Sequence, residues 1–114
     1  MENFNVLLAA YLLELTHKHN TRTAVEYPQL AAMALERTGS AAYEAFEATL
    51  GKRYARITRR LFHDAPGRGS AHCFVEIATG NIYKPASYAT PAKGVRGKLT
   101  NETKPIFCGD FYAR

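Results

Sequence analysis

Arginine and aromatic side chains alternate between residues 52 and 83, in a pattern that suits the binding of single-stranded nucleic acid. We expect the apolar residues of this region to form the buried face of a sheet: Ala55, Ile57, Leu61, Cys73, Val75, Ile77 and Ile82. Strand alternation then places other side chains on the opposite face: Tyr54, Arg56, Arg60, Phe62, His72, Phe74 and Tyr83. Aromatic rings stack on bases at about 1–3 kcal/mol each, and Arg neutralises phosphates. Alternatively, the aromatic residues form a second apolar layer and the arginines are solvated edge charges.

A second stretch, residues 84–98, is rich in Pro, Gly, Ala and Lys and contains no acidic residue. Gly94 and Gly97 let backbone donors approach an anion closely, and Tyr88 adds an aromatic ring. Its positive charges belong to Lys84, Lys93, Arg96 and Lys98. This composition is typical of a phosphate-contacting loop, although it also fits a surface connection in which Pro and Gly shape turns and lysines maintain solubility. The spacing of a Walker motif is absent, so the sequence does not support nucleotide hydrolysis.

No catalytic or metal-binding group stands out. His17 and His19 are two residues apart on an expected helix, so they point in different directions and make poor joint metal ligands. His72 adjoins Cys73, but strand alternation is expected to place the two on opposite faces, away from a nucleophile–base geometry. We therefore predict a protein that is not an enzyme, with no cofactor and no metal.

The first fifty residues are expected to be helical. Apolar residues recur at spacings of three and four from about residue 2 to residue 19, and polar residues at 20–23 interrupt the pattern. A second helix is predicted from Pro28, which suits a first helical turn, to a stop at Gly39. A third is predicted from Ser40 to Gly51. Several apolar helix faces are wide for a domain of this size, which favours self-association into a homo-oligomer.

From residue 52 the apolar period changes to two, which predicts strands over residues 52–62 and 71–77. Residues 74–84 are predicted to form a hairpin around a turn at 78–81, and a final apolar run at 106–112 to add a strand or pack on the sheet. The predicted fold is α+β, with N-terminal helices packed on a small antiparallel sheet that carries a basic Gly/Pro loop. We expect one domain over residues 1–114, with a helical layer at 1–51 and a β-rich basic part at 52–114.

Charge is divided unevenly along the 114 residues. The net charge is +5, but residues 1–50 carry three basic and six acidic groups, and residues 51–114 carry twelve basic and four acidic groups. A polyanion is therefore a natural partner of the second half. The longest apolar run, Val6 to Leu13, is too short to span a membrane, so we expect a cytoplasmic protein with no membrane partner. Cys73 and Cys108 are then expected to remain unpaired.

The segment from Gly69 to Gly97 resembles a recurrent segment of small tailed-bacteriophage proteins. The matching residues read GSAHCFVEIATGNIYKPAS, followed by PAKGVRG, and an upstream strand, KRYARI, matches loosely. The resemblance covers about residues 52–98. It implies a phage origin and the cytoplasm of an infected bacterium, and it is compatible with small phage proteins that bind single-stranded DNA and assist replication or transcription. Such proteins often have Trp where Tyr88 stands here.

The sequence therefore predicts a non-catalytic phage protein that binds single-stranded nucleic acid, DNA rather than RNA, with little sequence preference. The expected contact residues are Tyr54, Arg56, Arg60, Phe74, Tyr83, Lys84, Tyr88, Lys93, Arg96 and Lys98. Further expected partners are a second copy of the chain and a phage or host replication or transcription protein. The alternative is an anti-host or anti-defence protein that binds a host protein or sequesters an anionic nucleotide, and a virion or scaffold component remains a third hypothesis.

Overall fold

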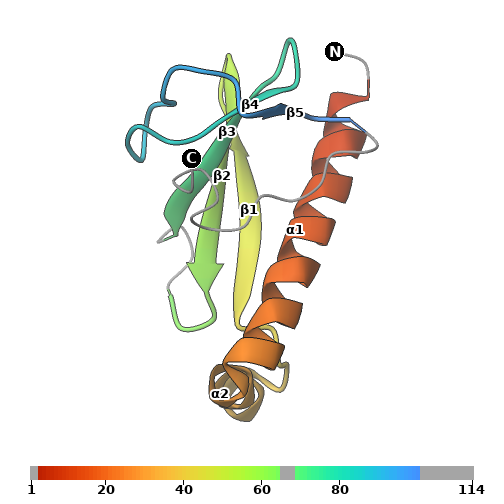
Figure 1. Cartoon of the computed structure of the whole chain (residues 1–114), viewed down its shortest axis with the longest axis vertical. Helices are drawn as coiled ribbons and strands as arrows, with labels where there is room; N and C mark the ends of the chain where they lie inside the picture. Colours follow the sequence, from red (N-terminus) through yellow and green to blue (C-terminus); the bar gives the residue numbers. More distant parts are fainter. Residues whose placement is uncertain (1–2, 65–68, 101–114) are drawn as a thin grey trace.

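Two helices precede a five-stranded antiparallel sheet in the computed structural model, which describes residues 3–64 and 69–100 (Figure 1). The elements are α1 (Phe4–Glu26), α2 (Pro28–Thr38), β1 (Glu44–Leu50), β2 (Tyr54–Leu61), β3 (Ser70–Glu76), β4 (Asn81–Tyr83) and β5 (Gly97–Lys98). The strands lie in sequence order, and each pairs with the next. The predicted α+β fold is confirmed. Among the described residues, no helix is long and apolar enough to cross a membrane.

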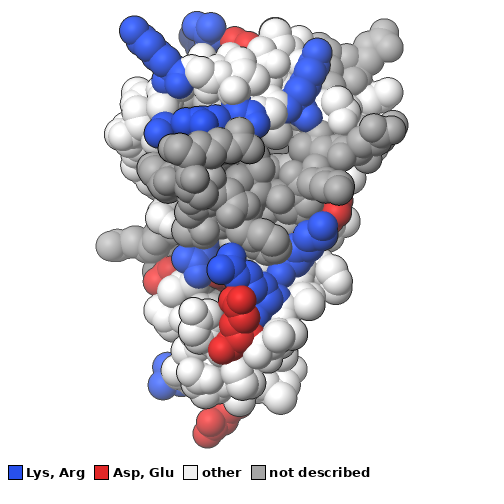
Figure 2. Space-filling view, viewed as in Figure 1, with Lys and Arg blue, Asp and Glu red and all other residues white. Residues whose placement is uncertain are grey.

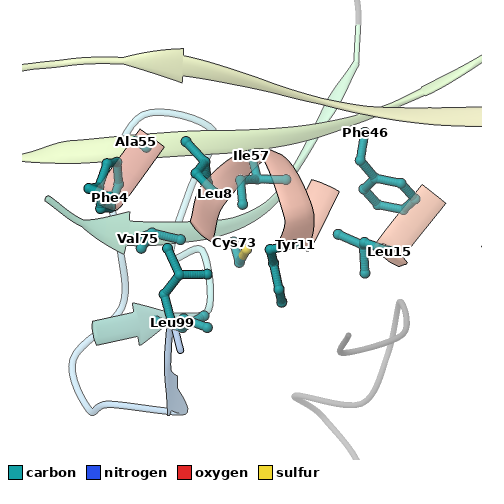
Figure 3. Packing of buried hydrophobic residues seen from close by; sticks show 11 residues of the cluster. Phe4, Leu8, Tyr11, Leu15, Phe46, Ala55, Ile57, Cys73, Val75 and Leu99 are labelled. Atoms are coloured by element: carbon teal, nitrogen blue, oxygen red, sulfur yellow. The ribbon is translucent and has the colours of Figure 1, made fainter. Parts of the chain in front are cut away.

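Helix α1 covers one face of the sheet, called here the inner face (Figure 1). One stripe of the helix points into the core, and it consists of Phe4, Leu8, Tyr11 and Leu15 (Figure 3). These side chains meet the buried strand residues Phe46, Ala55, Ile57, Cys73, Val75 and Ile82, together with Leu99 after β5. The expected inner face is thereby confirmed for five buried residues, and half-buried Ile77 also packs against this core, whereas Leu61 is half-buried and is not part of it.

The helical half differs from the prediction at two places. α1 does not end before Asn20 but continues to Glu26, because the Asn20 side chain bonds to a strand and does not compete for the local helix backbone. α2 has the expected Pro28 start and is capped after Thr38 by Gly39, which adopts the left-handed conformation with φ 80°. The helix predicted from Ser40 to Gly51 is wrong, since β1 occupies residues 44–50.

β1 is an edge strand of the sheet, and α1 supplies hydrogen-bond partners to its free edge. The Asn20 amide Nδ2 donates to the Glu44 carbonyl at 2.9 Å, and Asn20 Oδ1 accepts from the Glu44 amide at 3.0 Å. The Phe46 amide donates to Thr16 Oγ1 at 3.3 Å. A helix side chain therefore pairs with Glu44 as a neighbouring strand residue would, which blunts the exposed edge.

A β-bulge interrupts the ladder between β2 and β3. Cys73 pairs with Ile57 and Ala71 pairs with Thr58, so His72 is the extra residue on β3. On the other side of the bulge the expected alternation holds, and the predicted hairpin is confirmed by the pairing of β3 with β4.

The bulge turns His72 toward α1. Its ring centroid lies 5.1 Å from that of Phe46 and 5.9 Å from that of His19, and the residue is buried. The prediction that His72 lies on the outer face, opposite Cys73, is therefore wrong. A bulge places two successive residues toward the same side of a sheet, and the apolar periodicity of the sequence does not predict where a bulge occurs.

The loop between β4 and β5 is held by its own hydrogen bonds. Ser87 Oγ accepts from the amides of Ala89 and Thr90, and the Ala86 amide donates to the Thr90 carbonyl at 2.9 Å. The Ala92 amide then returns to the Lys84 carbonyl at 2.8 Å. The loop is thus an ordered excursion of the chain, as the turn chemistry of Ser and Thr favours. The apolar run expected at 106–112, and Cys108 with it, lies outside the described residues.

Replacing Asn20 by alanine should destabilise the protein, because it removes both side-chain bonds to the Glu44 backbone. An unsatisfied buried polar group costs about 1–3 kcal/mol, so we expect a loss of that size in the free energy of unfolding. Urea titration followed by circular dichroism measures it. Asn5→Ala is the matched control, since Asn5 is exposed on the same helix. Equal stability of the two variants would contradict this role for Asn20.

Candidate nucleic-acid interface

The outer face of the sheet, which faces away from α1, gathers three of the predicted aromatic residues. Tyr54 lies with its ring centroid 6.2 Å from that of Phe74 and 5.9 Å from that of Tyr83, both edge-on. Phe74 is only 3% exposed, whereas the other two are half-buried. Phe74 therefore offers no open ring to a base, and the three rings pack on one another as the alternative interpretation expected.

Arg56 and Tyr88 connect the outer face to the loop. The guanidinium carbon of Arg56 lies 4.3 Å from the centre of the Tyr88 ring, which is a cation–π contact. Tyr88 remains 46% exposed. The Arg56 Nε is buried and has no hydrogen-bond partner among the residues that the structure describes. An aromatic ring accessible to a base therefore lies beside an arginine with an unused donor.

A groove of about 240 Å³ opens between the β1–β2 turn and the tip of this loop. It is lined by Thr49, Leu50, Gly51, Lys52, Arg53, Tyr54, Arg56, Phe74 and Ala89. Three of these residues are basic and none is acidic. Sequence reasoning assigned neither Lys52 nor Arg53 to the site, although two adjacent basic residues at the start of a predicted strand are a visible signal.

Several arginines of β2 and the preceding turn are neutralised by carboxylates of neighbouring strands. Arg60 Nε donates to Glu47 Oε1 at 2.8 Å, and the Arg60 side chain is 25% exposed. Arg53 Nε donates to Glu76 Oε2 at 3.0 Å. Arg60 was predicted to contact phosphate, but in the structure it forms an ion pair with Glu47 within the sheet.

The loop was predicted to contact phosphate partly through its backbone amides, but the structure shows a different arrangement of donors. The Arg96 amide donates to the Ile82 carbonyl at 2.7 Å, so this backbone donor is already used. Gly94 has φ 97°, a conformation that suits glycine. Lys93 is exposed and Arg96 half-buried, and no carboxylate of the described residues forms an ion pair with either. Their side chains, more than the loop backbone, are available to an anion.

The remaining two predicted lysines lie at the ends of the loop. Lys84 is half-buried directly after β4, and Lys98 is exposed in β5, opposite Asn81. Both side chains have further interactions within the molecule. In Figure 2, the charged side chains at the upper end of the molecule are mainly basic, with a small acidic patch beside them at the top, whereas basic and acidic side chains are intermixed farther down.

A buried polar cluster lies on the inner face, away from this surface. His19 Nδ1 lies 2.9 Å from Glu44 Oε1, and Arg59 Nε donates to Glu44 Oε2 at 2.6 Å. Burial acts to raise the pKa of Glu44, but the hydrogen bond from His19 and the charge of Arg59 outweigh it, so the pKa is lowered. Sequence reasoning missed this cluster because its members come from three different elements.

The thiol of Cys73, next to His72 in β3, is a poor candidate nucleophile. Burial raises the pKa of the Cys73 thiol strongly, and a hydrogen bond with Tyr11 offsets this only in part. Cys73 is free and buried, as expected, and remains a neutral thiol with little nucleophilic character. Within residues 3–64 and 69–100, no three His, Cys, Asp or Glu side chains are grouped so that they could hold a metal ion.

Comparison with known proteins places the chain in a family of unknown function. The chain matches the model of a family described as "Family of unknown function (DUF7717)" over residues 2–110. No curated protein and no solved structure matches the chain.

Acid should weaken the fold through Glu44. Because its pKa is lower in the folded protein than the ordinary value of 4.5, its contribution to stability is full above about pH 4.5 and is lost as the pH falls through the folded-state pKa. Glu44→Gln should flatten this part of the pH profile of the melting temperature. At neutral pH it should cost about 3–5 kcal/mol, the usual result of breaking a buried pair.

Glu47→Gln is the matched control for this measurement, since Glu47 lies on the same strand and pairs with an arginine but is exposed. Exposed ion pairs contribute about 0.2–1 kcal/mol, so its effect should be small. An unchanged acid profile in Glu44→Gln would show that other groups cause the acid sensitivity.

Proposed function

The chain belongs to this family of unknown function, and from its geometry we propose that it binds single-stranded nucleic acid, without catalysis and with little sequence preference. The observation that carries the proposal is the groove beside Tyr88, which is lined by three basic residues and no carboxylate. Phosphates are attracted by unpaired Lys and Arg, and an exposed ring stacks on any base. We expect DNA to be the natural ligand.

The charges support one continuous contact surface. Lys52 and Arg56 line the groove, and Lys93 and Arg96 follow in the loop that carries Tyr88. None of the four forms an ion pair with a carboxylate of the described residues. A strand that enters at the groove would stack a base on the free side of Tyr88 and run its phosphates along the loop.

The helices support single-stranded over duplex DNA. Duplex readers commonly insert a basic helix into the major groove. Here the basic residues of α1 that face solvent are paired within the helix, Lys18 with Glu14 at 3.7 Å and Arg22 with Glu26 at 2.8 Å. This helix therefore presents little unpaired positive charge to a duplex.

A second proposed function is binding to another protein, which an apolar surface of α1 favours. Val6 and Leu13 are exposed large apolar residues seven positions apart, and so on one side of the helix. An apolar groove beside them is lined by Ala9, Leu12, Leu13, Thr16, His17 and Phe46. A second copy of the chain, or a phage or host replication or transcription protein in the infected cell, would fit this surface, as would the host target of an anti-host protein.

Binding to oligonucleotides should depend on salt through the loop cations. For single strands, the logarithm of the binding constant falls with the logarithm of the salt concentration by about 0.7 per phosphate contact. Lys93→Ala combined with Arg96→Ala should therefore weaken binding equally for all sequences and reduce the slope by about 1.4. Fluorescence anisotropy with labelled single strands across a salt series measures both quantities.

Lys18→Ala combined with Arg22→Ala is the control, because it removes the same charge from α1. It should leave the slope almost unchanged. No binding of wild-type protein at low salt would refute the proposed function, and an equal effect of the two double variants would remove the loop from the site.

If a base stacks on Tyr88, replacing this residue should change the affinity for oligonucleotides but not the salt dependence of binding. Tyr88→Ala should weaken oligonucleotide binding by about 1–3 kcal/mol, the usual value of one stacked base, with little change in salt slope. Tyr88→Trp keeps a stacking ring and should bind at least as tightly as wild type. If alanine and tryptophan variants bind equally, Tyr88 does not contact a base.

A further inference from the structure

The groove at the β1–β2 turn suits a ligand more specific than a nucleic-acid backbone. We propose that it binds a phosphate monoester, the terminal phosphate of an oligonucleotide or a mononucleotide. The proposal rests on the proposed function for its natural ligand, nucleic acid, and names the chemical group that this part of the site recognises. It is carried by the charge, the donors and the size of the groove.

The charge of the groove matches that of a phosphate monoester. Lys52 and Arg56 have no ion pair with any carboxylate in the described part of the chain, whereas the third cation, Arg53, pairs with Glu76. Two positive charges therefore remain uncompensated. A phosphate monoester carries about two negative charges at neutral pH, since its second pKa is about 6, whereas a backbone phosphodiester carries one. The two unpaired cations of the groove therefore match the charge of a terminal phosphate better than that of a phosphodiester within an oligonucleotide.

The main donor of the groove is already oriented. Contact with the Tyr88 ring at 4.3 Å restrains the plane of the Arg56 guanidinium. Its Nε is buried without a partner among the described residues, so the guanidinium keeps an unused donor at the wall of the groove. Arginine binds phosphate with a planar fork of two parallel hydrogen bonds, and a fixed plane reduces the entropy lost on binding. Thr49 and Lys52, which carry a hydroxyl and an ammonium group, line the same groove.

The size and walls of the groove favour a small anion. Its volume of about 240 Å³ lies below the roughly 300–1,000 Å³ of pockets that enclose drug-sized ligands, so one phosphate with part of its sugar fits better than several nucleotides. Leu50, Phe74 and Ala89 supply apolar wall on the same groove. Apolar walls exclude water and strengthen the attraction between a bound anion and the two unpaired cations. A base attached to this phosphate would lie within reach of Tyr88 at the loop tip.

The test compares one single-stranded sequence with three ends: a 5′-phosphate, a 3′-phosphate, and hydroxyls at both ends. Anisotropy should show about tenfold tighter binding of at least one phosphorylated form, the value of one additional charge-assisted hydrogen bond.

Lys52→Ala combined with Arg56→Gln should remove this preference. Lys93→Ala combined with Arg96→Ala should weaken all three ligands equally and keep it. Thermal melting confirms that each variant is folded, and Arg56→Lys, which keeps the charge but loses the fork, should retain only part of the preference.

A second measurement needs no variant. Titration of the ¹⁵N-labelled wild-type protein with deoxyadenosine monophosphate should shift the amide resonances of residues 49–54, and deoxyadenosine should not. Oligonucleotides that bind with equal affinity whatever their ends would overturn the phosphate monoester site and leave the proposed function standing. Mononucleotide shifts at residues 49–54 without oligonucleotide binding would refute the proposed function and keep the site. Shifts absent from these residues would contradict the site on their own.

Discussion

The carboxylate of Glu44 connects the three parts of the molecule that must fit together. It lies at the start of β1, and its two oxygens accept from His19 on α1 and Arg59 on β2. Its backbone bonds to the Asn20 side chain, one residue further along the same helix. A buried carboxylate is costly unless paired, so this arrangement requires helix, edge strand and neighbouring strand to assemble in one register. The apolar core then extends along α1 from this anchor toward Phe4.

The position of β1 also decides where positive charge remains. The acidic residues of the first half include Glu44 and Glu47, and both lie on β1, beside the arginine-rich β2. The charge difference between the two halves of the chain is therefore partly cancelled within the sheet. What is left uncompensated gathers at the β1–β2 turn and in the β4–β5 loop, where the groove lies. The candidate site is therefore smaller and more local than a basic face of the whole sheet.

The outer face of the sheet works mainly as a support for this site. Phe74, Tyr54 and Tyr83 pack edge to face, and Tyr88 is brought over Arg56 by a loop that its own Ser and Thr hydrogen bonds hold in shape. Rigid aromatic packing below and an ordered loop above reduce the motion of the Arg56 guanidinium. A pre-oriented donor loses less entropy on binding, so this packing would favour the ligand binding that we propose.

The elements with strong periodicity could be predicted from the local sequence: the apolar stripe of α1, the Pro28 start of α2, the alternation of β2 and the β3–β4 hairpin. Each depends on neighbours within one element or one turn. The apolar spacing at Tyr43, Phe46 and Leu50 predicts a helix over residues 40–51, although the alternation of Glu44, Phe46 and Ala48 also fits a strand. Pairing with β2 stabilises the strand. Three other features arise only when distant strands come together: the bulge at His72, the pairing of Arg60 with Glu47 and the groove beside Arg56. These features depend on which strands become neighbours. The partner of a charged side chain cannot be predicted from its own charge, because it is set by the pairing of segments that are distant in the sequence.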